Sequence, residues 1–224
     1  MAKKTSEKAK LKKELRKQLQ EEQLRKQNIV NEATARVDIL DGLTPLTKFT
    51  INNESYEVKF FTRDSIPSDV LDTVFDLTKT NMKSSYEACD WGWKDGQKWS
   101  EFVDNTARFL VLYNNDKIAG FVHFRFMVDE GFEVIYIYEI QIDKSYQSRG
   151  LGAKLIRLIE FIGMKNHMQF SALTCFKHNP KAYRFYTIKM GYVIDAQSPS
   201  KFDIDECYEI LSKCIDPHLV PPTR

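Results

Sequence analysis

The feature that most constrains the fold is a strand, a glycine-containing turn, a helix and a second strand in direct succession. Residues 132–142 form a run of β-branched and aromatic side chains, and residues 150–167 place leucine and isoleucine at helical spacing. A second short apolar run follows at residues 170–176. Strand periodicity that changes to helical periodicity and back predicts a mixed α/β domain, in which helices flank one central sheet.

The remaining pattern predicts that most of this sheet is antiparallel. Strands are expected at residues 107–113 and 118–128, and turn-forming residues separate them from each other and from the strand at 132–142. A helix is expected to run from Ser68, which can cap it, toward Tyr86. We also expect a strand at 56–61, a helix at 178–190 ended by Gly191, and strands at 192–194 and 207–212.

The first 27 residues are strongly basic, unlike the rest of the chain. They hold ten lysine or arginine residues and four glutamates, a net charge of +6, so the remainder carries −4 of the total +2. The segment predicts a helix, on which Leu11, Leu15 and Leu19 form a narrow apolar stripe. That stripe can pack on the body or on a partner; the alternative is a solvated, charged helix.

These signals divide the chain into three parts. We expect a basic helical arm at residues 1–42, a folded domain at 43–214 and a C-terminal tail at 215–224, because Asp41, Gly42 and Pro45 interrupt the pattern. A basic arm joined to an acidic body indicates contact with nucleic acid, a ribosome or an import receptor through the arm. The same asymmetry indicates a cationic substrate for the body.

Composition argues against several classes of protein. No run of about 18 apolar residues and no secretory signal is found, and Ala2 stands where N-myristoylation requires glycine, so no membrane contact is expected. The four cysteines form no CxxC pair and the four histidines do not cluster with them. We therefore expect reduced thiols, no metal site, and a location in the nucleus and cytoplasm.

The turn before the central helix has the chemistry of a phosphate-binding loop. It reads Gln147-Ser148-Arg149-Gly150-Leu151-Gly152 and leads directly into the helix. Glycine lets the backbone approach a ligand, and a helix start offers unpaired N–H groups and the positive end of the helix dipole. The pattern therefore predicts a cradle for a diphosphate; a simple strand-to-helix turn is the alternative.

With its flanking strand and helix, this loop resembles that of the GNAT acetyltransferases, which bind the pyrophosphate of acetyl-CoA there. Over residues 70–212 the chain also resembles the N-alpha-acetyltransferase D family, which acetylates the amino ends of histones H4 and H2A at Ser-Gly-Arg-Gly. The matching motifs are Phe75-Asp76-Leu77-Thr78-Lys79-Thr80-Asn81-Met82, Tyr86-Glu87, Trp91-Gly92-Trp93-Lys94-Asp95, His123-Phe124-Arg125-Phe126, Tyr138-Glu139 and Phe176-Lys177-His178-Asn179.

The resemblance implies that Glu139 is the catalytic carboxylate. An α-amine has a pKa of about 7.7 to 8.0, whereas a solvated glutamate has a pKa of about 4.3, a mismatch of roughly 5 kcal/mol. We expect burial beside Tyr136 and Tyr138 to raise the pKa of Glu139 and a water molecule to relay the proton. The alternative is an edge glutamate that faces solvent or pairs with a lysine.

The resemblance also implies the acetyl-CoA site. The backbone of Ile140, Gln141 and Ile142 would pair with the pantetheine arm, a role in which their side chains would matter little. The pyrophosphate would lie against the loop, with Arg149 adding charge, and Asn179 would hydrogen-bond the coenzyme. The full set of expected coenzyme residues is Ile140, Gln141, Ile142, Gln147, Ser148, Arg149, Gly150, Leu151, Gly152 and Asn179.

For the acceptor, the resemblance implies an aromatic-walled channel formed by Tyr86, Trp91, Asp129, Tyr136, Tyr138, Thr174 and Tyr208. Asp129, with its neighbours Glu130 and Glu133, would meet the arginine at the third position of the tail. A plain hairpin turn is the alternative for this segment. Met127 stands where that family has a further acid, which weakens the expected contact with the arginine.

Three further expectations concern the chemistry. Cys175 has no base placed to activate it, so direct transfer without an acyl-enzyme is expected. No catalytic role is expected for His123, His167 or His178. Tyr183 or Tyr186 could protonate the leaving thiolate, although core packing is the preferred reading for both. A GNAT enzyme that acetylates lysine or small amines, and a non-catalytic ribosome or chromatin adaptor, are the competing functions.

Overall fold

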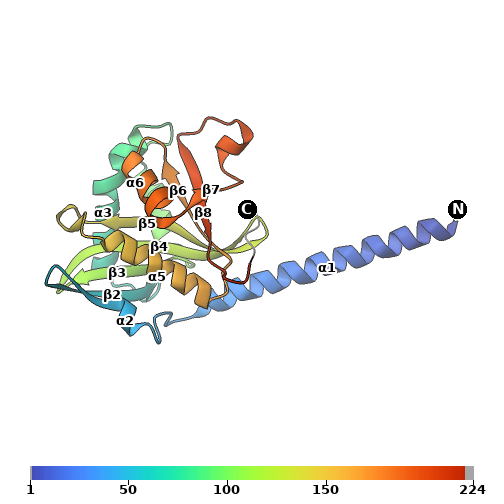
Figure 1. The fold of residues 1–224 in the computed structure, drawn as a ribbon, viewed down its shortest axis with the longest axis horizontal. Coiled ribbons are helices and arrows are strands. Elements are labelled where there is room, and N and C mark those ends of the chain that lie inside the picture. The colour runs from blue at the N-terminus through green and yellow to red at the C-terminus, as the bar shows by residue number, and fades with distance from the viewer. Residues whose placement is uncertain (1, 220–224) are drawn as a thin grey trace.

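The computed structural model describes residues 2–219, and a single sheet of eight strands organises this part of the chain (Figure 1). The strands lie in the order β1-β2-β3-β4-β5-β6-β8-β7, and only the β5–β6 pairing is parallel. Their bounds are β1 Lys48–Ile51, β2 Glu54–Thr62, β3 Arg108–Asn114, β4 Lys117–Asp129, β5 Phe132–Ile142, β6 Phe170–Phe176, β7 Val193–Ile194 and β8 Tyr208–Cys214.

Helices cover both faces of the sheet. One face carries α3 and α4, whose buried residues cluster with Phe109, Val111 and Phe121 of the sheet. The other face carries α5, which Figure 1 shows lying across the strands, together with the end of α1. The helices are α1 Ala2–Ala35, α2 Thr44–Thr47, α3 Ser68–Glu87, α4 Asp95–Phe102, α5 Leu151–Lys165 and α6 Pro180–Arg184, and short 3-10 helices span Lys144–Tyr146 and Pro199–Phe202.

The predicted fold class is confirmed, and β5 and β6 begin and end at the predicted residues. The predicted Ser68 cap is wrong, because Pro67 precedes the helix and no side chain caps it. The helix predicted at 178–190 begins at Pro180 and widens into a π-helix over Phe185–Met190, before Gly191 ends it at φ 76°. Sequence reasoning missed β1, α2 and α4, which are four, four and eight residues long.

A β-bulge in β5 decides which side chains face which layer. Opposite β4, His123 pairs with Glu139 and the next residue pairs with Ile137, so Tyr138 is an extra residue. Ile137 and Ile140 consequently both pack in the α5 layer, whereas Tyr138 and Glu139 both face the α3–α4 layer. Strict alternation would have placed Tyr138 and Glu139 on opposite faces of the sheet.

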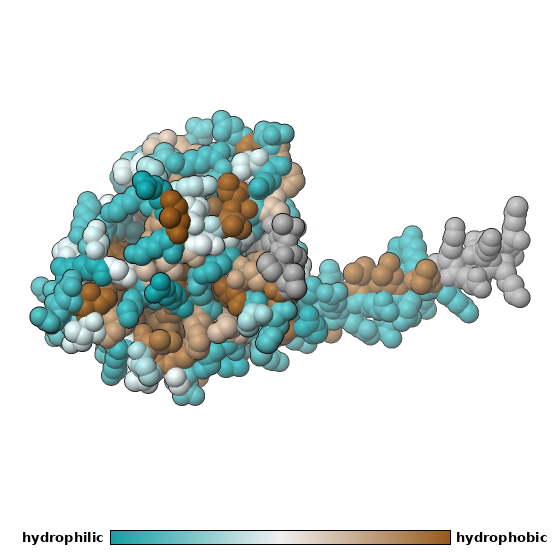
Figure 2. Space-filling model, in the orientation of Figure 1, coloured by the Kyte–Doolittle hydropathy of each residue, from teal (hydrophilic) through white to brown (hydrophobic). Residues whose placement is uncertain are grey.

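The arm helix α1 is partly attached to the body. Leu11, Leu15 and Leu19 are 73%, 54% and 52% exposed, and Figure 2 shows an apolar stripe along this projecting helix. Val30 and Ala33, near its end, are buried in the main core. Packing therefore extends N-terminal to residue 43, where the sequence places the start of the domain. Among residues 2–219, no helix combines the length and apolar character needed to cross a bilayer.

Candidate active site

The site is formed where two neighbouring strands separate. β5 and β6 pair only from Val134–Phe170 to Ile137–Leu173, although both strands continue beyond this point. Past Ile137, the edge of β5 that faces β6 has no strand partner, so its backbone groups are available to a ligand. Two cavities open along this edge, one beside Glu139 and one beside Gly150.

The cavity at Gly150 has a volume of about 410 Å³ and the geometry of a coenzyme cradle. Gly150 adopts a left-handed φ of 85° and stands at the N-terminus of α5, without a side-chain cap to use the first N–H groups of the helix. A Cβ at Gly150 would meet open space, so the approach to these N–H groups is clear. The expected residues that line this cavity are Ile140, Gln141, Ile142, Gln147, Ser148, Gly150, Leu151, Gly152 and Asn179.

Arg149 lies elsewhere than expected. Its guanidinium forms an ion pair with Glu54 of β2 at 2.6 Å and donates to the backbone oxygen of Ser145 at 2.7 Å. It is absent from the cavity lining, where the exposed Lys144, Lys181 and Lys189 supply positive charge instead. Ser148, directly before Arg149, adopts a left-handed φ of 63°, and the Arg149 side chain reaches β2, which lies three positions from β5 in the sheet.

Side-chain amides hold the end of β5 in place beside this cavity. The Asn81 and Gln147 side chains donate to the backbone oxygen of Ile142 at 3.2 and 3.0 Å. The Asn81 amide also donates to the Gln141 side chain at 3.1 Å. Asn179 caps α6 by accepting from the Ala182 N–H at 3.1 Å, which fixes its position at the boundary of both cavities.

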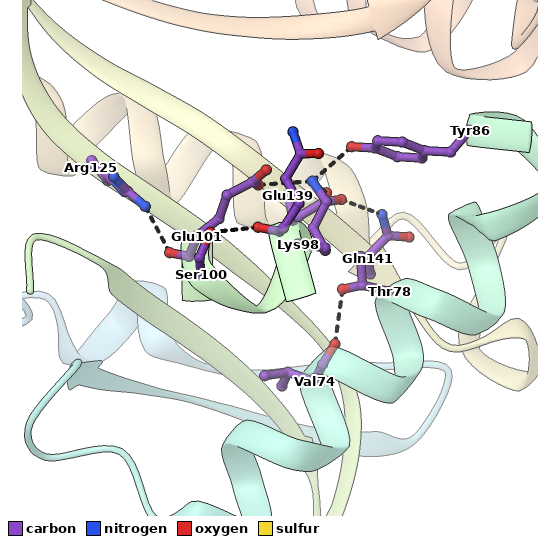
Figure 3. A network of polar contacts seen from close by, with 10 residues as sticks. Val74, Thr78, Tyr86, Lys98, Ser100, Glu101, Arg125, Glu139 and Gln141 are labelled. Carbon is purple, nitrogen blue, oxygen red and sulfur yellow. Dashed lines mark hydrogen bonds and ion pairs between the residues drawn. The ribbon is translucent and has the colours of Figure 1, made fainter. Parts of the chain in front are cut away.

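The second cavity, of about 350 Å³, contains Glu139 (Figure 3). Glu139 is only 5% exposed, and both of its carboxylate oxygens have protein partners. Oε1 accepts from Lys98 Nζ at 3.0 Å and Oε2 accepts from Gln141 Nε2 at 2.9 Å. Sequence analysis gave, as the alternative for Glu139, an ion pair with a lysine at the edge of the sheet. An ion pair with a lysine is present, but it is buried in the cavity wall.

Gln141 thus has a role that sequence analysis did not give it. Its side chain lies between Asn81 and Glu139, accepting from the first and donating to the second. This arrangement fixes which end of the amide faces the carboxylate. Sequence analysis considered residues 140–142 only for pairing with the pantetheine arm, and it did not foresee that the Gln141 amide orients the Glu139 carboxylate.

Aromatic rings close the other side of this cavity. Trp91 stacks near Tyr208 and Phe176, at centroid distances of 4.9 and 5.4 Å, and Tyr86 lies 5.0 Å from Phe176. Burial, reinforced by the charge of Glu139, raises the pKa of Tyr86, so its hydroxyl keeps its proton. The expected acceptor residues that line the cavity are Tyr86, Trp91, Tyr136, Tyr138 and Thr174, and Tyr208 supports Trp91 from behind.

Asp129 is not among the lining residues. It pairs with Phe132 at the end of the β4–β5 hairpin, where Glu130 and Gly131 adopt left-handed backbone angles. These angles are those of the plain hairpin turn that was the alternative for this segment. Its neighbour Glu133 is 2% exposed and pairs with Arg25 of α1 at 3.5 Å. Glu133 therefore faces the arm helix, and it does not join Asp129 in an acidic patch for a substrate arginine.

Three further titratable groups in or beside the cavity stay neutral. Burial raises the pKa of Cys175 to about 11, so this residue stays a thiol. His123 is stacked between Phe109 and Tyr138, and burial lowers its pKa well below the ordinary value. Burial also raises the pKa of Tyr186, which lines both cavities. Within residues 2–219 no group of three or more metal-ligating side chains is found.

Sequence reasoning missed Lys98, Glu101 and Asn81 as site residues. Lys98 and Glu101 lie on α4, a segment whose helical signal is short because only Trp99 and Phe102 mark its apolar face. Asn81 stands inside a recognised motif, but nothing in its sequence neighbours indicates which of its contacts matter. Positions on α3 and α4 become part of the site only because both helices pack beside β5.

Solved acetyltransferases share this fold. An acetyltransferase from Streptococcus agalactiae aligns with 71% of this chain and 98% of its own, at 16% identity and a TM-score of 0.57. The PaiA N-acetyltransferase of Thermoplasma acidophilum in complex with coenzyme A aligns over 71% and 98%, at 16% identity and a TM-score of 0.52. The ribosomal-protein-S18-alanine N-acetyltransferase of Escherichia coli aligns over 74% and 98%, at 16% identity and a TM-score of 0.50.

A family model covers more than half of the chain and includes both cavities. It is the acetyltransferase (GNAT) family model, and it matches residues 73–192, from α3 through β5, the Gly150 turn and α6. The matched segment contains Glu139, the unpaired edge of β5 and the N-terminus of α5. This chain therefore belongs to the GNAT family of acetyl-CoA-dependent acetyltransferases.

Proposed function

We propose that this enzyme moves the acetyl group of acetyl-CoA to the free α-amino group of a protein, with the Ser-Gly-Arg-Gly ends of histones H4 and H2A as substrates. The observation that carries the proposal is the meeting of the two cavities. Both are lined by Ile140 and Gln141 of β5 and by Asn179, Ala182 and Tyr186 of the α6 region. A thioester placed along β5 would therefore end beside Glu139.

The aromatic wall supports a chain terminus as the acceptor. The space that Tyr86, Trp91 and Tyr136 leave in front of Glu139 is confined. Such a space suits the N-terminal residue of a protein chain, if that residue is small, with its α-amino group next to Glu139. A lysine side chain presents its amine on a long flexible stem and needs no such confinement. The E. coli enzyme with the same fold acts, by its name, on the alanine of ribosomal protein S18.

Glu139 is the group placed to accept the proton of the acceptor amine. Bound acetyl-CoA supplies an activated acetyl carbon; the chain supplies orientation and the base. The α-ammonium gives one proton to Glu139, directly or through water, and the nitrogen then bonds to the acetyl carbon. As the carbon–sulfur bond breaks, the nitrogen gives a second proton to solvent. The leaving thiolate takes a proton from solvent. Because the Cys175 thiol stays protonated, direct attack is preferred over an acyl-enzyme.

Mass spectrometry of peptides incubated with acetyl-CoA and the protein tests this proposal. A Ser-Gly-Arg-Gly peptide should gain one acetyl group at its amino end, and the same peptide with a blocked amino end and an internal lysine should stay unmodified. Acetylation of only the blocked peptide would favour a lysine acetyltransferase. Absence of any acetyl-CoA binding by calorimetry would favour the non-catalytic adaptor.

We also propose that the basic arm contacts nucleic acid or the ribosome in the nucleus and cytoplasm. Lys10, Lys12, Lys13, Arg16 and Lys17 are exposed on the projecting part of α1, beyond the turns that pack on the core. Binding of RNA that weakens steeply as salt rises, and that disappears when these five residues are replaced by glutamine, would support this role.

A further inference from the structure

The cavity that holds Glu139 contains a cation that the proposed reaction has not used. Lys98 of α4 is 6% exposed, and its ammonium donates to Glu139 Oε1 at 3.0 Å, Glu101 Oε2 at 2.8 Å and the Tyr86 hydroxyl at 2.7 Å. An ammonium has three donors, so these contacts use all of them. Figure 3 shows the Lys98 ammonium joined to Tyr86 on one side and to Glu101 on the other, with Glu139 beside it.

One buried cation thus serves two carboxylates. Two carboxylates that share a site cannot both stay ionised without compensation, because burial and mutual repulsion favour a proton on one of them. Lys98 supplies that compensation. Although burial alone lowers the pKa of a lysine, Glu139, Tyr86 and Glu101 raise the pKa of Lys98 above its ordinary value, so it stays charged.

The other groups around this pair do not change charge near neutral pH. Tyr86 of α3 and Tyr186 of the π-helix have raised pKa values, through burial and the charge of Glu139. The pKa of His123 on β4 is lowered and that of Cys175 on β6 is about 11, both through burial. Arg125 of β4 is paired with Asp104 at 3.1 Å. The carboxylates of Glu139 and Glu101 are therefore the two anions in this cluster that Lys98 contacts directly.

We propose that Lys98 is a positioning residue that keeps the Glu139 carboxylate ionised and oriented toward the acceptor amine, and so sets the acidic limit of the reaction. The inference rests on the proposed function of the site. Lys98 does not line the coenzyme cavity, and its contact with the proposed base is the hydrogen bond to Glu139 Oε1. It also leaves the site with one net negative charge, because it compensates one of two carboxylates, and this charge suits an incoming α-ammonium.

The test is the pH dependence of kcat/KM for a Ser-Gly-Arg-Gly peptide in Lys98→Met, which keeps the length of the side chain and removes its charge. We expect kcat/KM at neutral pH to fall by about ten-fold for each pH unit by which the acidic limb of the profile moves above the assay pH, because the base then holds a proton. The acidic limb of the profile should move up by about one pH unit or more, so that activity returns as pH rises. Lys98→Arg, which keeps the cation, should retain the wild-type limb.

The double variant Lys98→Met/Glu101→Gln separates charge from packing. Removing the second carboxylate along with the cation ends their repulsion, so we expect the acidic limb to move back toward that of the wild type. A loss by the same factor at every pH, in either variant, would mean that Lys98 only supports the fold and would overturn the inference. Acetyl-CoA affinity by calorimetry and the thermal midpoint show whether each variant is folded.

A readout that needs no turnover keeps this inference apart from the proposed function. Carboxyl carbons of isotopically labelled glutamate can be titrated by NMR in the wild type and in Lys98→Met. The variant should hold an extra carboxyl proton at neutral pH, and Lys98→Met/Glu101→Gln should not. If Lys98→Met holds the extra proton but the wild type does not acetylate the peptide, only the proposed acceptor is rejected. If the wild type is active but Lys98→Met holds no extra proton, the role of Lys98 is rejected.

Discussion

The two cavities of this enzyme are built in different ways. The coenzyme cavity is formed mainly by one continuous stretch, from the end of β5 through the Gly150 turn into α5, and it presents backbone groups and exposed lysines. The acceptor cavity is formed by side chains from α3, α4, β5 and β6, and its charged pair Lys98–Glu139, together with Gln141, is buried and hydrogen-bonded. Local sequence therefore specifies the first cavity, whereas the packing of distant segments specifies the second.

The largest expected difference between the cavities comes from Glu139→Gln. The amide keeps the shape of the side chain but cannot accept a proton from the amine, so kcat should fall by about 10² to 10⁴. Affinity for acetyl-CoA, measured by calorimetry, should stay the same because Glu139 does not line the coenzyme cavity. The exposed Glu87→Gln on α3 is the matched control. Undiminished turnover in Glu139→Gln would reject the assignment of the base.

The aromatic wall should give the next largest effect, again on the acceptor side alone. Trp91→Ala removes the ring that bridges Tyr208 and Phe176, and large aromatic anchors at binding sites are commonly worth about 2 kcal/mol, or roughly 30-fold. We expect the KM of the peptide to rise and the Kd of acetyl-CoA to stay constant. An equal change in both constants would show that the cavities are not separate.

On the coenzyme side, Gly150→Ala should weaken acetyl-CoA binding. A residue with a Cβ is strained at φ 85°, at a cost of about 1 to 2 kcal/mol, so the turn should shift and affinity should fall roughly 5- to 30-fold. Gly131→Ala is the matched control, because it has a φ of 79° and equally open surroundings but lies at the β4–β5 hairpin. Equal acetyl-CoA affinity in the two variants would contradict the cradle.

The smallest effects should come from the lysines of the coenzyme cavity. Exposed charges act weakly and are screened by salt, so Lys181→Ala or Lys189→Ala should each lower acetyl-CoA affinity by about two- to five-fold, and less at high salt. Arg149→Ala should leave that affinity unchanged, since Arg149 pairs with Glu54. If calorimetry showed a larger loss of acetyl-CoA affinity in Arg149→Ala than in the lysine variants, Arg149 would have to contact the coenzyme.

Elements with a clear local periodicity could be predicted from the sequence alone. The strand over Phe132–Ile142, the Gly150 turn, the helix that follows and the strand over Phe170–Phe176 could all be predicted, because alternation, glycine and helical spacing act between near neighbours. The coenzyme-binding loop was predicted from this same stretch of sequence. It also placed Glu139 on the strand beside that loop.

The surroundings of Glu139, in contrast, depend on the packing of segments that are distant in the sequence. The bulge at Tyr138 places this carboxylate on the same face as Tyr138 and α4, and pairing with β4 determines such an irregularity. Lys98, which contacts Glu139, lies 41 residues away in the chain. Arg25 forms an ion pair with Glu133, which therefore does not take part in the expected acidic patch. Ion pairs and bulges depend on which elements pack together, and a single sequence specifies its local periodicity far more directly than its long-range contacts.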